Sequence, residues 1–249
     1  MSNVVDLIFI FFMTKLSVNI NKIATLRNAR GSNIPNLINV TRDIESFGAN
    51  GITIHPRPDE RHIKYSDVYE LSKVVKSEFN IEGNPIPKFI ELVLAVKPDQ
   101  VTLVPDSVDD ITSNSGWNTK KHLNPLKKTV NIFKSQGIRT SIFLDPIPQM
   151  VEYAKKTGTD RIELYTEKYA KNFNESNRDK IKPYVEAAKI ADELNLGLNA
   201  GHDLNLSNIE YFKNNIPNLI EVSIGHALIC ESLYNGLQKT ISCYLKILN

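Results

Sequence analysis

Short apolar runs alternate with longer segments of helical spacing from Lys15 to the end of the chain. Several of the short runs are continuous rather than alternating, which is typical of buried parallel strands. They predict eight strands, at residues 16–20, 51–55, 79–82, 101–105, 140–145, 161–165, 197–200 and 221–224. The longer segments predict helices at residues 35–47, 65–76, 86–96, 123–135, 148–157, 179–194, 206–214 and 227–248. Helix C-caps are expected just after four of these helices, at Gly48, Gly137, Gly158 and Gly197.

Eight strand-then-helix units in a chain of 249 residues predict an α/β fold, a closed (β/α)₈ TIM barrel that forms one domain over residues 15–249. A doubly wound open sheet is the alternative that the pattern leaves open.

Residues 1–14 are expected to be an apolar N-terminal extension outside this domain. The apolar run at residues 4–13 contains Asp6 and is shorter than the roughly 20 residues of a membrane span. It also lacks the basic start and small-residue cleavage site of a signal peptide. We expect an upstream start codon with Met13 as the functional initiator, and a weak membrane tether is the alternative.

The net charge of +2, from 30 basic and 28 acidic residues, argues against a dedicated nucleic-acid-binding protein. An anionic ligand must therefore be bound by a local site. The two cysteines, Cys230 and Cys243, form no disulfide framework, which fits a protein of the reducing cytoplasm, and we expect both to be small core residues.

Polar side chains gather where the predicted strands end, which is the end of a TIM barrel that carries catalytic groups. These residues are Asn19, His55, Arg57, Glu82, Asp145, Glu163, Asn199, His202, Gly225 and His226. His122, at the start of a predicted helix, falls outside this set and is expected at the surface.

His55, Glu82 and His202 are candidates for general acid and base groups that converge on one pocket. Taken singly, each is equally consistent with a structural or solvent-facing residue. Glu163 stands inside an apolar strand, where burial is costly unless the carboxylate is paired or functional. The alternative for Glu163 is an inward-facing salt bridge within the barrel.

Three basic or glycine-containing segments are candidate anion sites. Residues 223–227 lead from the last strand into a helix, a common phosphate-binding arrangement in barrels. The second segment contributes Arg57, Arg61 and His62, and the third contributes Arg27 and Arg30. Two separated anion sites flanking His and Glu predict two phosphorylated substrates or one bisphosphate. Metal-ligand spacings and glycine-rich nucleotide motifs are absent from the sequence, which leaves acid–base chemistry without a cofactor.

Specific sequence words also match a known family: VNI (18–20), IATLRNARG (23–31), GITIH (51–55), DERHI (59–63), LVP (103–105), NAGH (199–202) and IGHA (224–227). From about Lys15 to its end, the chain resembles the pyridoxine 5′-phosphate synthases, the ring-closing enzymes of deoxyxylulose-dependent vitamin B6 biosynthesis. The resemblance implies a TIM barrel with extra helices that assembles as a homo-octamer in the cytoplasm, without a cofactor, a nucleic-acid partner or a membrane.

The reaction that the resemblance implies condenses 3-amino-2-oxopropyl phosphate with 1-deoxy-D-xylulose 5-phosphate. The products are pyridoxine 5′-phosphate, inorganic phosphate and water. Carried over by position, His55 and Glu82 correspond to proton acceptors, His202 to a proton donor and Glu163 to a transition-state stabiliser. The amino-ketone phosphate would be bound by Asn19, Arg30, Gly225 and His226, and the sugar phosphate by Arg57, His62 and Thr112, the last in a loop that covers the site.

Three positions depart from the family pattern. Asn21-Lys22 replaces an Asp-His pair that contacts the sugar phosphate, Asp203 replaces a glycine after the catalytic histidine, and Ser115-Gly116-Trp117 replaces a Gly-Gly pair. The Asp203 carboxylate is expected to repel phosphate, with Lys22 as the group that offsets its charge. These departures keep two alternatives open: a degenerate barrel that binds without catalysis, and a different phosphate-binding barrel such as an aldolase or isomerase.

Overall fold

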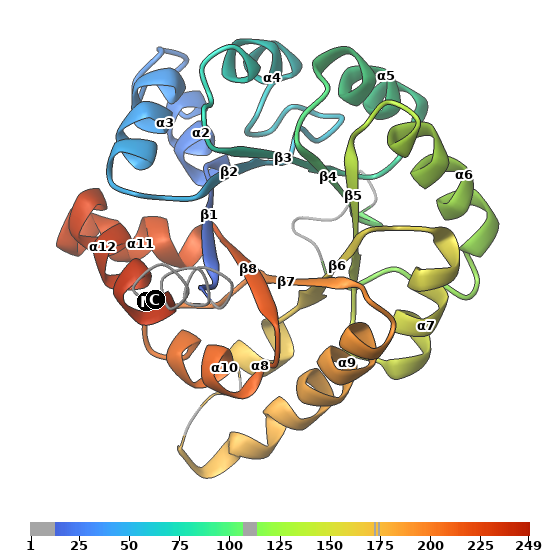
Figure 1. Cartoon of the computed structure of the whole chain (residues 1–249). Coiled ribbons are helices and arrows are strands. Elements are labelled where there is room, and N and C mark those ends of the chain that lie inside the picture. The colour runs from blue at the N-terminus through green and yellow to red at the C-terminus, as the bar shows by residue number, and fades with distance from the viewer. Residues whose placement is uncertain (1–12, 107–113, 172, 174) are drawn as a thin grey trace, which may run out of the picture.

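Eight parallel strands close into a barrel in the computed structural model, which describes residues 13–106, 114–171, 173 and 175–249 (Figure 1). The strands are β1 (Lys15–Asn19), β2 (Gly51–Ile54), β3 (Glu78–Gly83), β4 (Gln100–Leu103), β5 (Arg139–Leu144), β6 (Arg161–Tyr165), β7 (Gly197–Gly201) and β8 (Leu219–Ile224). Each strand pairs with the next in chain order, and β8 pairs with β1. This closure confirms the TIM barrel and excludes the open sheet. The apolar run at 4–12 lies outside the described residues.

Helices form an outer ring around the barrel (Figure 1). They are α2 (Asn21–Asn28), α3 (Leu37–Ser46), α4 (Tyr65–Ser72), α5 (Pro87–Val96), α6 (Leu123–Lys134), α7 (Pro148–Thr157), α8 (Glu167–Lys171), α9 (Lys182–Glu193), α10 (Ile209–Asn215), α11 (His226–Asn235) and α12 (Leu237–Leu248). A 3₁₀ helix, η1 (Glu175–Ile181), precedes α9. None of the helices in the described part of the chain is long and apolar enough to cross a membrane.

The structure differs from the prediction at one helix and one helix cap, and it contains two further helices. The helix expected at 227–248 is two helices, α11 and α12, because the backbone breaks at Gly236, where φ is +81°. Gly48, Gly137 and Gly158 have the expected positive φ after their helices, but Gly197 begins β7, and Asn195, with φ +51°, is the left-handed residue after α9. The helices α2 and α8 were not predicted. The first buries only Ile23, Ala24 and Arg27, and the second is five residues long.

The barrel interior is polar, whereas the layer between strands and helices is apolar. Ser17 Oγ lies 2.7 Å from Thr53 Oγ1, and Thr102 Oγ1 donates to Asn80 Oδ1 at 3.0 Å. All four of these side chains are buried. Hydrogen bonds between neighbouring strands thus satisfy these four buried side chains, as a stable core requires. The apolar side chains of the same strands pack toward the helices in one continuous core.

Candidate active site

A cavity of about 470 Å³ opens at the carboxyl ends of the strands, as the barrel rule predicts. Nine of the predicted site residues line it: Asn19, His55, Arg57, His62, Glu82, Glu163, His202, Gly225 and His226. Arg30 is exposed just beyond α2 and is not among the lining residues. Thr112 lies outside the described residues. Most of the predicted strand-end residues therefore converge on one pocket, whereas Asp145 and Asn199 are not among its lining residues.

His55 and Glu82 face each other inside the cavity. His55 Nδ1 lies 3.9 Å from Glu82 Oε2, which also accepts a 3.4 Å hydrogen bond from Asn19 Nδ2. Burial, followed by the charge of Arg57, lowers the pKa of His55 well below its usual value. Burial, followed by the charge of Asp106, raises the pKa of Glu82 to about 8. At neutral pH the cavity therefore holds a neutral imidazole beside a mostly protonated carboxyl group.

Glu163 is a second buried carboxyl group, at 3% exposure, and its Oε2 has no hydrogen-bond partner. Burial and the nearby charge of Glu82 raise the pKa of Glu163 well above its usual value. The alternative that Glu163 is a salt-bridged barrel residue finds no support among the described contacts, because none of the ion pairs there includes it. Its carboxyl fits against Gly201, where a Cβ atom would lie only 2.2 Å from Oε1. The glycine in the NAGH segment thus makes room for a carboxylic acid in the cavity wall.

A basic corner of the cavity surrounds His62. Burial and the charges of Arg57, Lys22 and Arg61 lower the pKa of His62 to about 4, so the ring is neutral at neutral pH. The Ile63 N–H donates to His62 Nδ1 at 2.9 Å. The remaining ring proton must then be on Nε2, which makes His62 a hydrogen-bond donor beside three cations. This combination suits an anionic phosphate.

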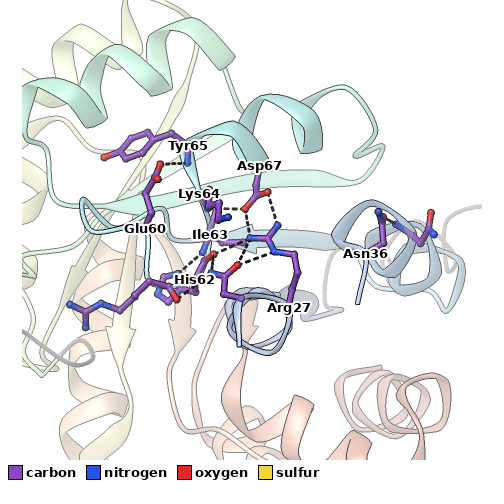
Figure 2. A network of polar contacts seen from close by, with 11 residues as sticks. Arg27, Asn36, Glu60, His62, Ile63, Lys64, Tyr65 and Asp67 are labelled. Atoms are coloured by element: carbon purple, nitrogen blue, oxygen red, sulfur yellow. Dashed lines mark hydrogen bonds and ion pairs between the residues drawn. The ribbon is translucent and has the colours of Figure 1, made fainter. Parts of the chain in front are cut away.

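A polar network fixes the loop that carries His62 (Figure 2). Asn28 Nδ2 donates to the His62 carbonyl at 2.8 Å, and Arg27 Nη2 donates to the same oxygen at 3.2 Å. Arg27 also forms a two-pronged ion pair with Asp67, at 2.6 and 2.8 Å. Arg27 is only 7% exposed, so its guanidinium is committed to the loop. The hypothesis that Arg27 forms an anion site together with Arg30 is wrong for this reason.

Another part of the cavity wall is formed where β8 leads into α11, on the other side of β1 from β2. Gly225 and His226 line the cavity at the start of this ten-residue helix, whose N-terminal end favours negative charge. A Cβ atom on Gly225 would lie 3.1 Å from Asn19 Cβ, so the glycine also lets β1 and β8 approach closely. These residues come from a different strand end than the basic corner around His62, which follows β2.

The substituted positions of the family pattern have defined contacts. Asn21 Oδ1 accepts a 2.9 Å hydrogen bond from the His55 N–H, an acceptor role that a carboxylate would also fill. Gly116 packs directly on the end of β5, where a Cβ atom would lie 2.2 Å from Leu144 Cα, and its N–H donates to Asp145 Oδ2 at 3.0 Å. Gly116 therefore anchors the end of the loop that follows β4.

Three lining residues were missed by the sequence reasoning: Thr25, Val104 and Phe143. Val104 and Phe143 pack with Tyr165 in a small apolar cluster of their own. Both residues belong to the carboxyl ends of β4 and β5, so the rule used for the polar residues would have found them. An apolar patch within a charged cavity provides a surface for the carbon skeleton of a small substrate.

The fold and the cavity together define a TIM-barrel protein with buried titratable side chains and basic residues in one pocket at the carboxyl ends of its strands. The described residues contain no cluster of side chains suited to a metal ion. The chain belongs to the family of the pyridoxal phosphate biosynthesis protein PdxJ, whose model matches residues 16–249. This membership confirms the resemblance read from the sequence and the expectation of an enzyme.

Individual relatives agree with this assignment. The chain is 65% identical over 236 residues to the pyridoxine 5′-phosphate synthase of Christiangramia forsetii, covering 95% of this chain and 100% of the relative. It is 63% identical over 237 residues to the enzyme of the same name from Parabacteroides distasonis, with coverage of 95% and 100%. Among solved structures, thiamine phosphate pyrophosphorylase from Pyrococcus furiosus superposes with a TM-score of 0.59 at 13% identity, covering 96% of each chain. That last similarity concerns the fold alone.

Proposed function

We propose that the chain is a pyridoxine 5′-phosphate synthase that condenses 3-amino-2-oxopropyl phosphate with 1-deoxy-D-xylulose 5-phosphate. The observation that carries the proposal is one cavity whose wall contains His55, Glu82, Glu163 and His202 together with two groups of candidate phosphate-binding residues, Arg57 with His62 and Gly225 with His226. Both substrates carry a phosphate, so a cavity with two such groups suits the pair. The relatives reported above bear the name of this enzyme.

The two phosphates take different sites. The amino-ketone phosphate, which remains in the product, binds at Asn19, Gly225 and His226, and the sugar phosphate, which leaves, binds at Arg57 and His62. The donor Nε2–H of neutral His62 fits the second role. Arg30 and Thr112 are proposed to complete the two sites, from positions outside the described cavity lining.

Proton transfer is divided among four side chains. His55, kept neutral by its low pKa, accepts a proton from the substrate amine or carbon. Burial keeps Glu82 protonated at neutral pH, and it becomes an acceptor once a cationic amine beside it lowers its pKa. Glu163 donates a hydrogen bond to negative charge that develops in the transition state, as a carboxyl kept protonated by burial is able to do. His202 gives a proton to the leaving oxygen.

Assembly as a homo-octamer in the cytoplasm, as one domain over residues 15–249 without a cofactor or membrane attachment, is part of the same proposal. Large apolar side chains support an interface between copies: Leu233 is 75% exposed and Tyr234 is 92% exposed on α11. Sedimentation of the purified chain checks the size.

The test mixes the purified chain with both substrates, without metal or nucleotide, and follows pyridoxine 5′-phosphate by mass spectrometry and phosphate by colorimetry. Equimolar formation of the two products is expected. His202→Ala is expected to lose about 100-fold or more in turnover, since general acid catalysis contributes roughly 10²–10⁴. His122→Ala is the matched control, because His122 lies outside the cavity lining, and it should keep full turnover. A folded protein that gives no product would overturn the proposal.

A further inference from the structure

Asp203 lines the cavity next to His202, and its carboxylate was expected from the sequence to repel phosphate. The structure places its carboxylate against the imidazole: His202 Nδ1 and Asp203 Oδ2 are 2.7 Å apart. This hydrogen bond is the main cause that lowers the pKa of Asp203, and the charges of His202, Lys171 and His226 add to it. Asp203 is therefore ionised, and its carboxylate is hydrogen-bonded to His202.

The backbone enforces this contact. His202 and Asp203 both have positive φ, +74° and +35°, a conformation that costs free energy in residues other than glycine. The Thr166 hydroxyl lies 2.6 Å from the Gly201 carbonyl and 2.7 Å from the His202 carbonyl, within hydrogen-bond distance of both. The Asp203 carbonyl accepts a 3.4 Å hydrogen bond from Asn208 Nδ2. The turn held in this way folds the Asp203 side chain back onto the ring that precedes it.

The imidazole is confined on another side as well. The ring of Tyr165 meets His202 nearly edge to face, at 5.2 Å between centroids and 83° between planes. Tyr165 is itself fixed by a 2.5 Å hydrogen bond from its hydroxyl to Glu167 Oε2. Asp203 and Tyr165 together leave the ring little freedom to rotate.

We propose that Asp203 is a positioning residue for His202: it accepts the Nδ1–H of the imidazole and so makes Nε2 the nitrogen that exchanges protons with the substrate. When His202 donates, the Nε2 proton leaves and the Nδ1 proton stays on the ring, held by Asp203. The carboxylate also stabilises the cationic ring before transfer. This inference rests on the proposed function for the proton-transfer role of His202, but the hydrogen bond itself does not.

The first test is independent of substrate. Protein labelled with ¹⁵N in its histidines is compared with Asp203→Gly and Asp203→Asn by NMR, with the His202 signals assigned from His202→Ala. In the unmodified protein the neutral ring of His202 should carry its proton on Nδ1. In Asp203→Gly the tautomer should change toward Nε2–H. An unchanged tautomer in Asp203→Gly would overturn the inference, whether or not the chain makes pyridoxine 5′-phosphate.

The second test uses steady-state kinetics. Asp203→Asn should lower kcat roughly 10- to 100-fold, as loss of a group that orients a catalytic histidine does, while both KM values change less than about threefold. Both variants should fold, because Asn and Gly tolerate positive φ better than Asp. Glu91→Gln removes one exposed negative charge from α5, away from the cavity lining and from the contacts of His202, and it should keep its kcat. A lower KM for 3-amino-2-oxopropyl phosphate with an unchanged kcat in Asp203→Asn would show instead that the carboxylate merely repels phosphate.

Discussion

Replacement of Gly201 by alanine tests how tightly Glu163 is held. A Cβ atom at this position would lie 2.2 Å from Glu163 Oε1, 3.2 Å from the Ser223 carbonyl oxygen and 3.3 Å from Glu163 Cδ. Gly201 is not among the glycines with positive φ, so alanine adds no backbone strain there. The effect must come from these close contacts, of which the one with the carboxyl group is by far the shortest.

The size of the effect follows from these distances. Ordinary van der Waals contact begins near 3.4 Å, so the carboxyl must retreat by about 1 Å in a fully packed wall. Overpacking of this kind typically costs about 1–3 kcal/mol. For a chain of this length each kcal/mol lowers the Tm by roughly 2–4 °C. A catalytic group displaced by about 1 Å can cost about 100-fold in rate.

Calorimetry and the product assay measure the two effects together. Gly201→Ala is expected to lower both the Tm and kcat. Gly137→Ala is the control: its Cβ atom would meet nothing within 4 Å, but φ is +75°, so about 1 kcal/mol of stability should be lost with no change in kcat. The double variant Gly201→Ala/Glu163→Asp shortens the acid by one methylene and should regain stability but not activity. A Gly201→Ala protein with the original Tm and kcat would refute the reasoning.

Two further outcomes are expected. Lys22→His removes a cation from the basic corner and should change the KM for 1-deoxy-D-xylulose 5-phosphate more than that for the amino ketone, and steady-state kinetics with equal changes would contradict the site assignment. Burial raises the Glu82 pKa from 4.5 to about 8, so in this window the folded protein keeps a proton that the unfolded chain has lost, and the free energy of unfolding falls as pH rises. The Glu82→Gln side chain cannot ionise, so the stability of this variant relative to the unmodified protein should increase between pH 5 and 8.5. The gain is about 1.4 kcal/mol for each pKa unit by which folding raises the pKa of Glu82. Urea denaturation at both pH values measures this gain, and curves that stay parallel would speak against a buried protonated Glu82.

The sequence was most informative where one periodicity decides the structure. Each of the eight strands lies within two residues of its predicted bounds, because buried parallel strands read as apolar runs whatever surrounds them. The helix α2 was missed because one of its three buried positions is Arg27. A charged residue there interrupts the apolar spacing of a helix, and its charge is paired with Asp67 from α4. The order of residues within α2 does not indicate a partner that lies 40 residues away in the chain.

The residues of the candidate site also fall into two groups, those that the sequence could predict and those that it could not. Residues at strand ends, such as His55 and Glu82, were predictable because the barrel brings all strand ends together. The contact between Asp203 and His202 was not, since the sequence indicates a charge but not the turn that folds it onto the preceding ring. The packing of Gly201 against Glu163 likewise depends on the register between β6 and β7.

The seam between β1 and β8 has a consequence for synthesis on the ribosome. Asn19, at the end of β1, lines the same cavity as Gly225, which follows β8, and a β1 strand without β8 has an unpaired edge. A nascent chain therefore lacks one wall of the cavity until β8 has been made, some two hundred residues after β1. The addition of β8 to the barrel therefore decides when the protein is able to bind its substrates. Truncated chains should expose an open sheet edge that chaperones recognise.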